Sequence, residues 1–187
     1  MGEVAAPRIR DAVRTRAAIL SAAQAAFATR GYAQAGVREI AAAASVDPAL
    51  VRRYFGSKEG LFEAALAETL DVHELLATPR DRFGPHITAF LIDEQHDRPN
   101  PLPIMMMAMA DPLVRPRVLT LLHRRVIEPL AAWIGGPDGA VRAARVSMIC
   151  SGFLTYSKLL PLDILSGGID PATRLWLEEA LQAAIDR

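Results

Sequence analysis

Two adjacent arginines, Arg52 and Arg53, are the residues of this sequence whose chemistry is easiest to interpret. A guanidinium group presents a planar fork of N–H donors that can hold O6 and N7 of a guanine or grip a phosphate. The hydroxyl of Tyr54 and the ammonium of Lys58 follow shortly afterwards, and both can donate to a phosphate oxygen. We therefore predict a surface that binds a polyanion. The alternative for the charged groups is ordinary solvated charge, and for Tyr54 it is packing at a helix edge.

Three further side chains are predicted to belong to the same surface. Arg38 falls in the first turn of a preceding helix, where a phosphate contact is favoured over the reading of a base. Ala49 and Leu50 precede the arginines on their helix and can contact thymine methyl groups.

The elements that must position these residues are two short helices. Apolar residues recur on one face of the segment Val37–Ala44, and Asp47 followed by Pro48 is typical of an N-cap and a first helical position. Val51 and Phe55 can then face inward and leave the arginines exposed. Two short helices joined in this way predict a helix-turn-helix, whose second helix enters the major groove of DNA. The spacing alone is shared with other pairs of helices in bundles.

Composition and charge agree with this interpretation. Of 187 residues, 51% are hydrophobic and 22% are charged, so the chain can form a sizeable core. The net charge is zero, yet residues 1–62 carry a surplus of four positive charges and the remainder an equal deficit. A basic front and an acidic back suit a protein that presents one end to a polyanion. Without a signal-peptide pattern or a run long enough for a bilayer, and with a single cysteine, Cys150, we expect a cytoplasmic protein.

Hydrophobic periodicity of three to four residues predicts an all-α fold of about nine helices. Asp111-Pro112 and Asp170-Pro171 repeat the N-cap pattern, and glycines fall where helices should end. The predicted helices lie near residues 11–30, 37–44, 48–55, 58–77, 85–96, 101–110, 112–134, 138–160 and 171–186. The first three are tightly spaced, which predicts a three-helix DNA-binding domain over residues 1–57 and a larger helical regulatory domain over residues 58–187.

The wider N-terminal stretch resembles the TetR (tetracycline-repressor-like) family of transcriptional regulators. The resemblance covers roughly residues 12–62, and the residues that carry it are Arg16, Ile19, Leu20, Ala23, Phe27, Gly31, Tyr32, Val37–Ala41 and Arg53–Leu61. It implies a homodimer, usually a repressor, that binds a near-palindromic operator in double-stranded DNA. It also implies release from the operator when a small molecule enters the second domain.

Three positions depart from the family pattern. Ser45 stands in the turn where glycine is usual, so a left-handed backbone there is mildly strained. Gly36 replaces a threonine or serine that could cap the following helix, and Arg52 stands where tyrosine is common. The first two departures affect stability and phosphate contacts, and the third is expected to change operator preference.

The second domain is rich in methionine and aromatic residues. These can form a plain core, since methionine fills irregular gaps, or line an adaptable apolar pocket for the small effector. The candidate pocket residues are Met105, Met106, Met109, Trp133, Met148, Phe153 and Tyr156. The helices near 138–160 and 171–186, the second with Leu175, Leu177, Leu181 and Ile185, are predicted to form the dimer interface.

Other functions receive less support. His73, His86, His96 and His123 show no paired ligand spacing, so no metal is expected, and no cofactor or catalytic signature is found. A helical small-molecule-binding protein or enzyme that keeps the fold without operator binding is the main alternative, and a protein-interaction module is another. The basic residues around the predicted recognition helix argue against both.

Overall fold

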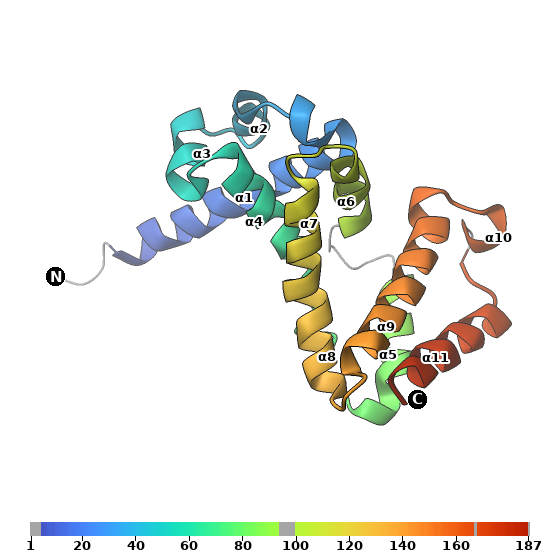
Figure 1. Ribbon diagram of the computed structural model, residues 1–187. Coiled ribbons are helices and arrows are strands. Elements are labelled where there is room, and N and C mark those ends of the chain that lie inside the picture. Colours follow the sequence, from blue (N-terminus) through green and yellow to red (C-terminus); the bar gives the residue numbers. More distant parts are fainter. Residues whose placement is uncertain (1–4, 94–99, 167, 187) are drawn as a thin grey trace. The chain divides into compact units, whose positions relative to one another are not determined.

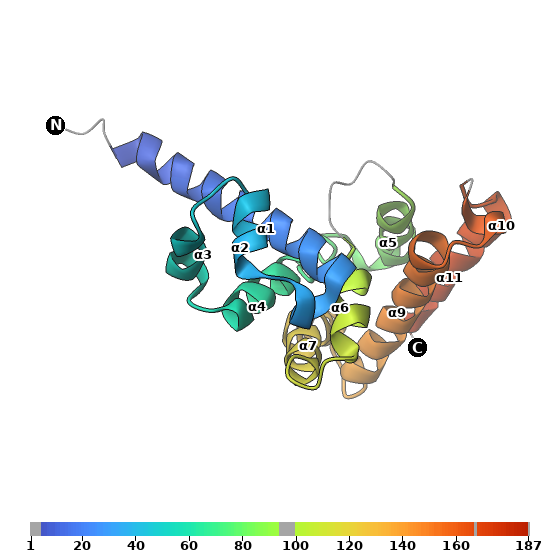
Figure 2. The same cartoon turned by 90° about the horizontal axis from the view of Figure 1, so that it is seen from above.

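The computed structural model describes the backbone of residues 5–93, 100–166 and 168–186, and the side chains of residues 11–93, 100–165 and 168–186. Every regular element within these ranges is a helix (Figures 1 and 2), which confirms the predicted all-α fold. No helix in this part of the chain is long and apolar enough to cross a membrane.

The chain divides into two compact units. The N-terminal unit comprises Met1–Thr69 and Pro103–Leu119, and the C-terminal unit comprises Leu70–Leu102 and Thr120–Arg187. The N-terminal unit therefore extends beyond the predicted domain of residues 1–57. It also contains the helix that follows Ser57 and the stretch Pro103–Leu119. The functional boundary at residue 57 stays a prediction.

The N-terminal unit is built on helices α1 (Ala5–Gln34), α2 (Val37–Ala43), α3 (Pro48–Phe55) and α4 (Lys58–Thr69). The later stretch of chain adds most of α6 (Pro101–Met109) and the first half of α7 (Arg115–Leu122). Helix α1 begins before the predicted residue 11 and kinks at Gly31, which has a φ of 72°. It packs on α4 through the rings of Phe27 and Phe62, which are fully buried with centroids 5.3 Å apart.

Helix α4 ends at Thr69, whereas the sequence predicted a helix that extends to about residue 77. The Asp71 carboxylate accepts a hydrogen bond from the backbone N–H of His73 at 2.9 Å. Such a local bond offers the backbone an alternative to the helix, and residues 73–76 form a turn.

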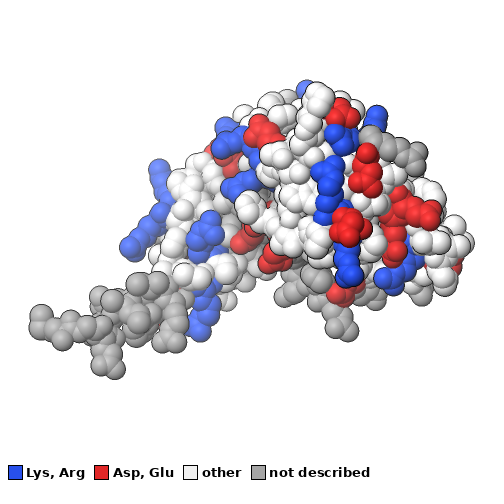
Figure 3. All heavy atoms as spheres, turned by 90° about the horizontal axis from the view of Figure 1, so that it is seen from below, with Lys and Arg blue, Asp and Glu red and all other residues white. Residues whose placement is uncertain are grey.

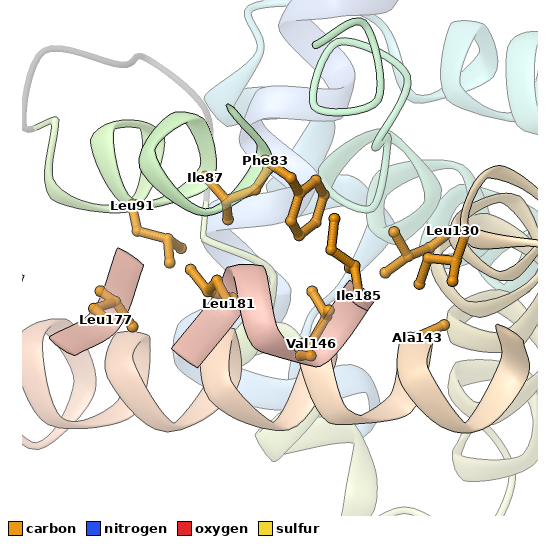
Figure 4. Close-up of a cluster of buried hydrophobic side chains, with 11 residues drawn as sticks. Phe83, Ile87, Leu91, Leu130, Ala143, Val146, Leu177, Leu181 and Ile185 are labelled. Atoms are coloured by element: carbon orange, nitrogen blue, oxygen red, sulfur yellow. The ribbon is translucent and has the colours of Figure 1, made fainter. Parts of the chain in front are cut away.

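The C-terminal unit contains α5 (Phe83–Ile92), α8 (Glu128–Ile134), α9 (Gly139–Leu154) and α11 (Pro171–Asp186). A 3₁₀ turn (Arg80–Arg82) precedes α5, and the short α10 (Asp163–Ser166), which was not predicted, precedes α11. Helix α5 ends at Ile92, where the following residue, Asp93, has an extended backbone. The prediction placed residues 94–96 in this helix as well, and these lie outside the described residues. The shared core of the four helices is drawn in Figure 4 and consists of Phe83, Ile87, Leu91, Leu130, Ile134, Ala143, Val146, Leu177, Leu181, Ala184 and Ile185.

Two of the longer helices contain a π-helical turn. Helices α7 and α8 are joined by the π-turn His123–Ile127, and α9 continues into the π-turn Thr155–Leu159. Pro129 and Pro161 follow these turns, and a proline has no N–H for the usual helical hydrogen bond. The predicted helix from residue 112 begins at Arg115 instead, because the carboxylate of Asp111 caps a turn by accepting from the N–H of Leu113 at 2.9 Å.

Two arginines bind the carboxyl ends of α8 and α11. Arg80 donates to the carbonyl oxygens of Ile134 at 2.7 Å and Ile185 at 2.6 Å. Arg142 donates to the same Ile185 oxygen at 2.9 Å and to that of Gly135 at 3.3 Å. The last carbonyls of a helix have no partner within it, so the two guanidinium groups satisfy oxygens that would otherwise be left unpaired.

Candidate DNA-binding surface

Helices α2 and α3 form the predicted helix-turn-helix. Ile40, Ala41 and Val51 are buried between the helices of the N-terminal unit, which fixes the inner faces of α2 and α3. The N–H of Val46 donates to the Ala41 oxygen and the N–H of Ser45 to the Ala42 oxygen, both at 3.0 Å. This pair of bonds is a Schellman motif, which ends a helix with one residue in the left-handed conformation.

Ser45 is that left-handed residue, with a φ of 55°. The prediction of a strained serine in the turn is therefore confirmed. The second departure is confirmed as well, because Gly36 occupies the N-cap of α2 and supplies no side-chain hydrogen bond.

Helix α3 begins as predicted. The carboxylate of Asp47 accepts a hydrogen bond from the N–H of Ala49 at 2.7 Å, and Pro48 occupies the first helical turn. Gly56, with a φ of 75°, ends the helix, and the hydroxyl of Ser57 caps α4 by accepting from the N–H of Gly60 at 3.1 Å. The N–H of Gly56 donates to the carbonyl oxygen of Arg52 at 2.9 Å, so both ends of α3 are set by local hydrogen bonds.

The outer side of α3 carries the predicted contact residues. Ala49, Arg52 and Arg53 are exposed, while Leu50 and Tyr54 are half-buried. Among the described residues, no hydrogen bond or ion pair engages the guanidinium of Arg52, Arg53 or the equally exposed Arg38. The guanidinium groups of Arg38, Arg52 and Arg53 are therefore available to an external anion. On the face drawn in Figure 3, basic and acidic side chains are both exposed.

Lys58 has a partner within the protein. Its ammonium donates to the carbonyl oxygen of Ala33 at 3.2 Å and lies 4.6 Å from the ring centroid of Tyr32. The side chain thereby supports the end of α1. An ammonium has three donors, so a phosphate contact by Lys58 stays a prediction beside this structural role.

A hydrogen bond between Tyr32 and Glu59 was not anticipated from the sequence. The Tyr32 hydroxyl donates to Glu59 at 2.8 Å, and burial together with this bond raises the pKa of Tyr32 to about 12. The N–H of Glu59 itself, then the hydroxyls of Tyr32 and Ser57, lower the pKa of Glu59 to about 2. Both residues belong to the stretch that carries the family resemblance. This resemblance was the only feature of the sequence that singled them out. They join the end of α1 to the first turn of α4, directly after the recognition helix.

The candidate pocket residues fall in both units. Met105 is half-buried on α6, where Met106 and Met109 are exposed. In the C-terminal unit, Trp133 packs on Phe83 with ring centroids 5.1 Å apart, and Phe153 packs against the core. Met148 and Tyr156 are exposed. An effector pocket lined by these residues stays a prediction.

The described residues contain no group of three or more histidines, cysteines, aspartates or glutamates that could hold a metal ion. His96 lies outside the described residues. Burial raises the pKa of the Cys150 thiol to about 12, which favours the unreactive thiol over the thiolate.

A helix-turn-helix with free arginines on its second helix, followed by a larger helical unit, defines a DNA-binding regulator. Residues 19–65 match the family model of bacterial regulatory proteins of the tetR family, and residues 81–185 match the tetracyclin repressor-like C-terminal domain. These matches include most of the chain. The protein therefore belongs to the TetR family of transcriptional regulators.

Solved structures agree with this assignment, although no curated protein matches the sequence. A TetR-family regulator from Streptomyces coelicolor A3 is 25% identical with a TM-score of 0.58, and the match covers 94% of this chain and 96% of the other. Another Streptomyces coelicolor TetR-family transcriptional regulator is 20% identical with a TM-score of 0.58, over 93% of each chain. A transcriptional regulator from Rhodococcus sp. Rha1 is 23% identical with a TM-score of 0.55, over 91% of this chain and 93% of the other. The last two support the fold alone.

Proposed function

We propose that the protein is a cytoplasmic homodimer that represses transcription by binding a near-palindromic operator, and that a small, largely apolar effector releases it. The observation that carries the proposal is the outer face of α3, where Arg52 and Arg53 are exposed on a helix capped at both ends. A rigid helix with unengaged guanidinium groups can enter a major groove without first breaking internal ion pairs.

The individual roles follow from donor type and position. Arg52 and Arg53 read guanine through O6 and N7, and Ala49 and Leu50 contact thymine methyl groups. Tyr54, Arg38 and Lys58 bind phosphates and fix the register of the protein on the duplex. Tyrosine is common in the family at the position of Arg52, so this arginine is the candidate for an operator preference particular to this chain.

Selection of operators from a random pool tests these roles. A two-fold dimer presents two recognition helices, so half-sites should lie about one helical turn (~34–36 Å) apart, or a multiple of it. If Arg52 or Arg53 reads a guanine, its alanine variant loses on the order of 1–3 kcal/mol at that base pair only. A phosphate role gives a uniform loss instead. If neither variant alters affinity or the selected sequence, the proposed reading face is wrong.

Dimerisation is proposed to use the outer faces of α9 and α11. Met148 on α9 is 66% exposed, and Leu175 and Trp176 on α11 are 55% and 61% exposed. The other leucines considered for this interface, Leu177 and Leu181, are buried in the core of the C-terminal unit, as is Ile185. Of the α11 residues considered from the sequence, only Leu175 remains available to a partner.

Sedimentation of a double variant, Met148→Glu with Trp176→Glu, tests the interface. Two charges in an apolar interface should give monomers, because a buried carboxylate without a partner is strongly unfavourable. Ala172→Glu is the control, since Ala172 is exposed on the same helix and the change adds a carboxylate without breaking an ion pair. A folded double variant that dimerises at the same protein concentration as the wild type would contradict the assignment.

A further inference from the structure

Methionine is concentrated in one turn of α6. Four of the six methionines of the chain are Met105, Met106, Met107 and Met109. Met106 is 57% exposed, Met107 40% and Met109 43%, so peroxide in solution can reach three of the four. Thioethers at such positions are oxidised readily to sulfoxides, which are polar.

Met107 packs directly on the backbone of α1. A Cβ atom built at Gly31 would lie 3.3 Å from the terminal methyl carbon of Met107, 3.8 Å from its Cβ and 3.9 Å from its carbonyl oxygen. Gly31 and Met107 belong to the same compact unit. Gly31 is also the kink of α1, with a φ of 72°, so the methionine covers the point at which the helix changes direction.

The residue after the kink is Tyr32, which joins α1 to the start of α4. Its hydroxyl donates to Glu59, its ring lies 5.5 Å from that of Phe62, and the Lys58 ammonium stands over the ring. Lys58 and Glu59 follow Ser57, the residue that leads out of the recognition helix. A change at the Met107–Gly31 contact therefore acts on the junction that positions α3.

We propose that Met107 is an oxidation site through which a hydroperoxide lowers the affinity of the protein for its operator. The inference rests on the operator binding proposed above. In the reaction the thioether sulfur gives up two electrons and forms an S=O bond, the O–O bond of hydrogen peroxide breaks, and the second oxygen leaves as water with both protons. The sulfur that gains the oxygen is bonded to the methyl group that lies beside Gly31, so the larger and more polar sulfoxide disturbs this contact. Met106 is the most exposed of the four, at 57%, and its oxidation adds an oxygen to a side chain that already faces solvent.

The experiment uses the full chain in a Met148→Leu background, so that the candidate dimer face carries no methionine. The parent, a Met107→Leu variant and a Met106→Leu control are treated with hydrogen peroxide, and each sulfoxide is located by peptide mass spectrometry. Operator affinity is measured by fluorescence anisotropy before and after treatment, and again after incubation with methionine sulfoxide reductases. Methionine-to-leucine exchange nearly conserves volume, and circular dichroism verifies that each variant folds.

The parent and the Met106→Leu control should lose about tenfold in affinity, equivalent to about 1.4 kcal/mol, and the reductases should restore it. The Met107→Leu variant should keep its affinity. An equal loss in that variant, or a Met107 that stays unoxidised while its neighbours react, overturns the proposal. Untreated wild-type protein that binds no DNA would instead count against the proposed function. In that case the effect of Met107 oxidation is measured by the midpoint of thermal unfolding. Oxidation should lower this midpoint in the parent and leave it unchanged in Met107→Leu.

Discussion

Gly84 lies at a close approach of α5 and α11 in the C-terminal unit. A Cβ atom at this position would lie 2.1 Å from the carbonyl oxygen of Glu178 and 3.0 Å from both the backbone nitrogen and the Cβ of Gln182. The backbone N–H of Gly84 also donates to the side chain of Gln182 at 3.0 Å. The obstacle is mainly the backbone of α11, which cannot rotate away as a long side chain could. Gly84→Ala must therefore push α5 and α11 apart.

The expected loss of stability is the balance of two effects. Overpacking a core typically destabilises by about 1–3 kcal/mol, and a clash with backbone belongs at the upper end of that range. Alanine in a helix recovers up to about 1 kcal/mol relative to glycine. The net loss should be about 2 kcal/mol, which for a chain of this length lowers the midpoint of thermal unfolding by about 4–8 °C.

Calorimetry or circular dichroism on Gly84→Ala measures this shift. His86→Ala is the control because His86 is exposed on the same helix, and its effect should stay within about 0.5 kcal/mol. A Gly84→Ala variant as stable as the wild type would show that α5 and α11 do not approach each other so closely.

Three more predictions concern the N-terminal unit. Ser45→Gly should raise the free energy of unfolding in denaturant by about 0.5–1 kcal/mol, since relief of the left-handed strain exceeds the entropy that glycine loses, and Ser45→Ala should give no gain. Lys58→Ala should weaken binding to all operator sequences alike and lower the salt slope by about one; an unchanged slope with reduced stability would leave only its structural role. Glu59, with its pKa lowered from 4.5 to about 2, favours the folded state above pH 4.5 and loses this contribution as the pH falls toward 2. Thermal unfolding between these pH values should therefore be less acid-sensitive in Tyr32→Phe, and an identical pH dependence would contradict the role of this hydrogen bond.

The features that could be predicted from the sequence are those set by local hydrogen bonds. Asp47 caps α3 as predicted, and Asp170 caps α11 by accepting from the N–H groups of Ala172 at 2.9 Å and Thr173 at 3.1 Å. The strained turn at Ser45 belongs to the same class, because a residue in this Schellman motif must be left-handed whatever its type. Each depends on residues only a few positions apart, so the spacing of residue types is enough to infer it.

The features that were missed depend on contacts between distant parts of the chain. Nothing near Lys58 in the sequence indicates that its ammonium reaches Ala33, and nothing near residue 103 indicates that this stretch packs with the N-terminal unit. Periodicity shows that one face of α11 is apolar, but Leu175 and Trp176, which lie outside that face, are apolar as well. Only the packing of α5 and α9 shows that Leu181 is inside and Trp176 outside.

The arginines at the ends of α8 and α11 stabilise the face that is proposed to bind a partner protomer. Arg142 is largely enclosed, and its hydrogen bonds to Ile185 and Gly135 are joined by one to Asp138, which lowers the pKa of that carboxyl. Because α9 carries Arg142 and α11 carries Ile185, the two helices proposed to form the interface are tied together within one protomer. A face that is already rigid loses little conformational entropy on association, so more of the apolar contact contributes to affinity. The exposed Met148 and Trp176 are thus presented by a scaffold whose geometry is set before the partner arrives.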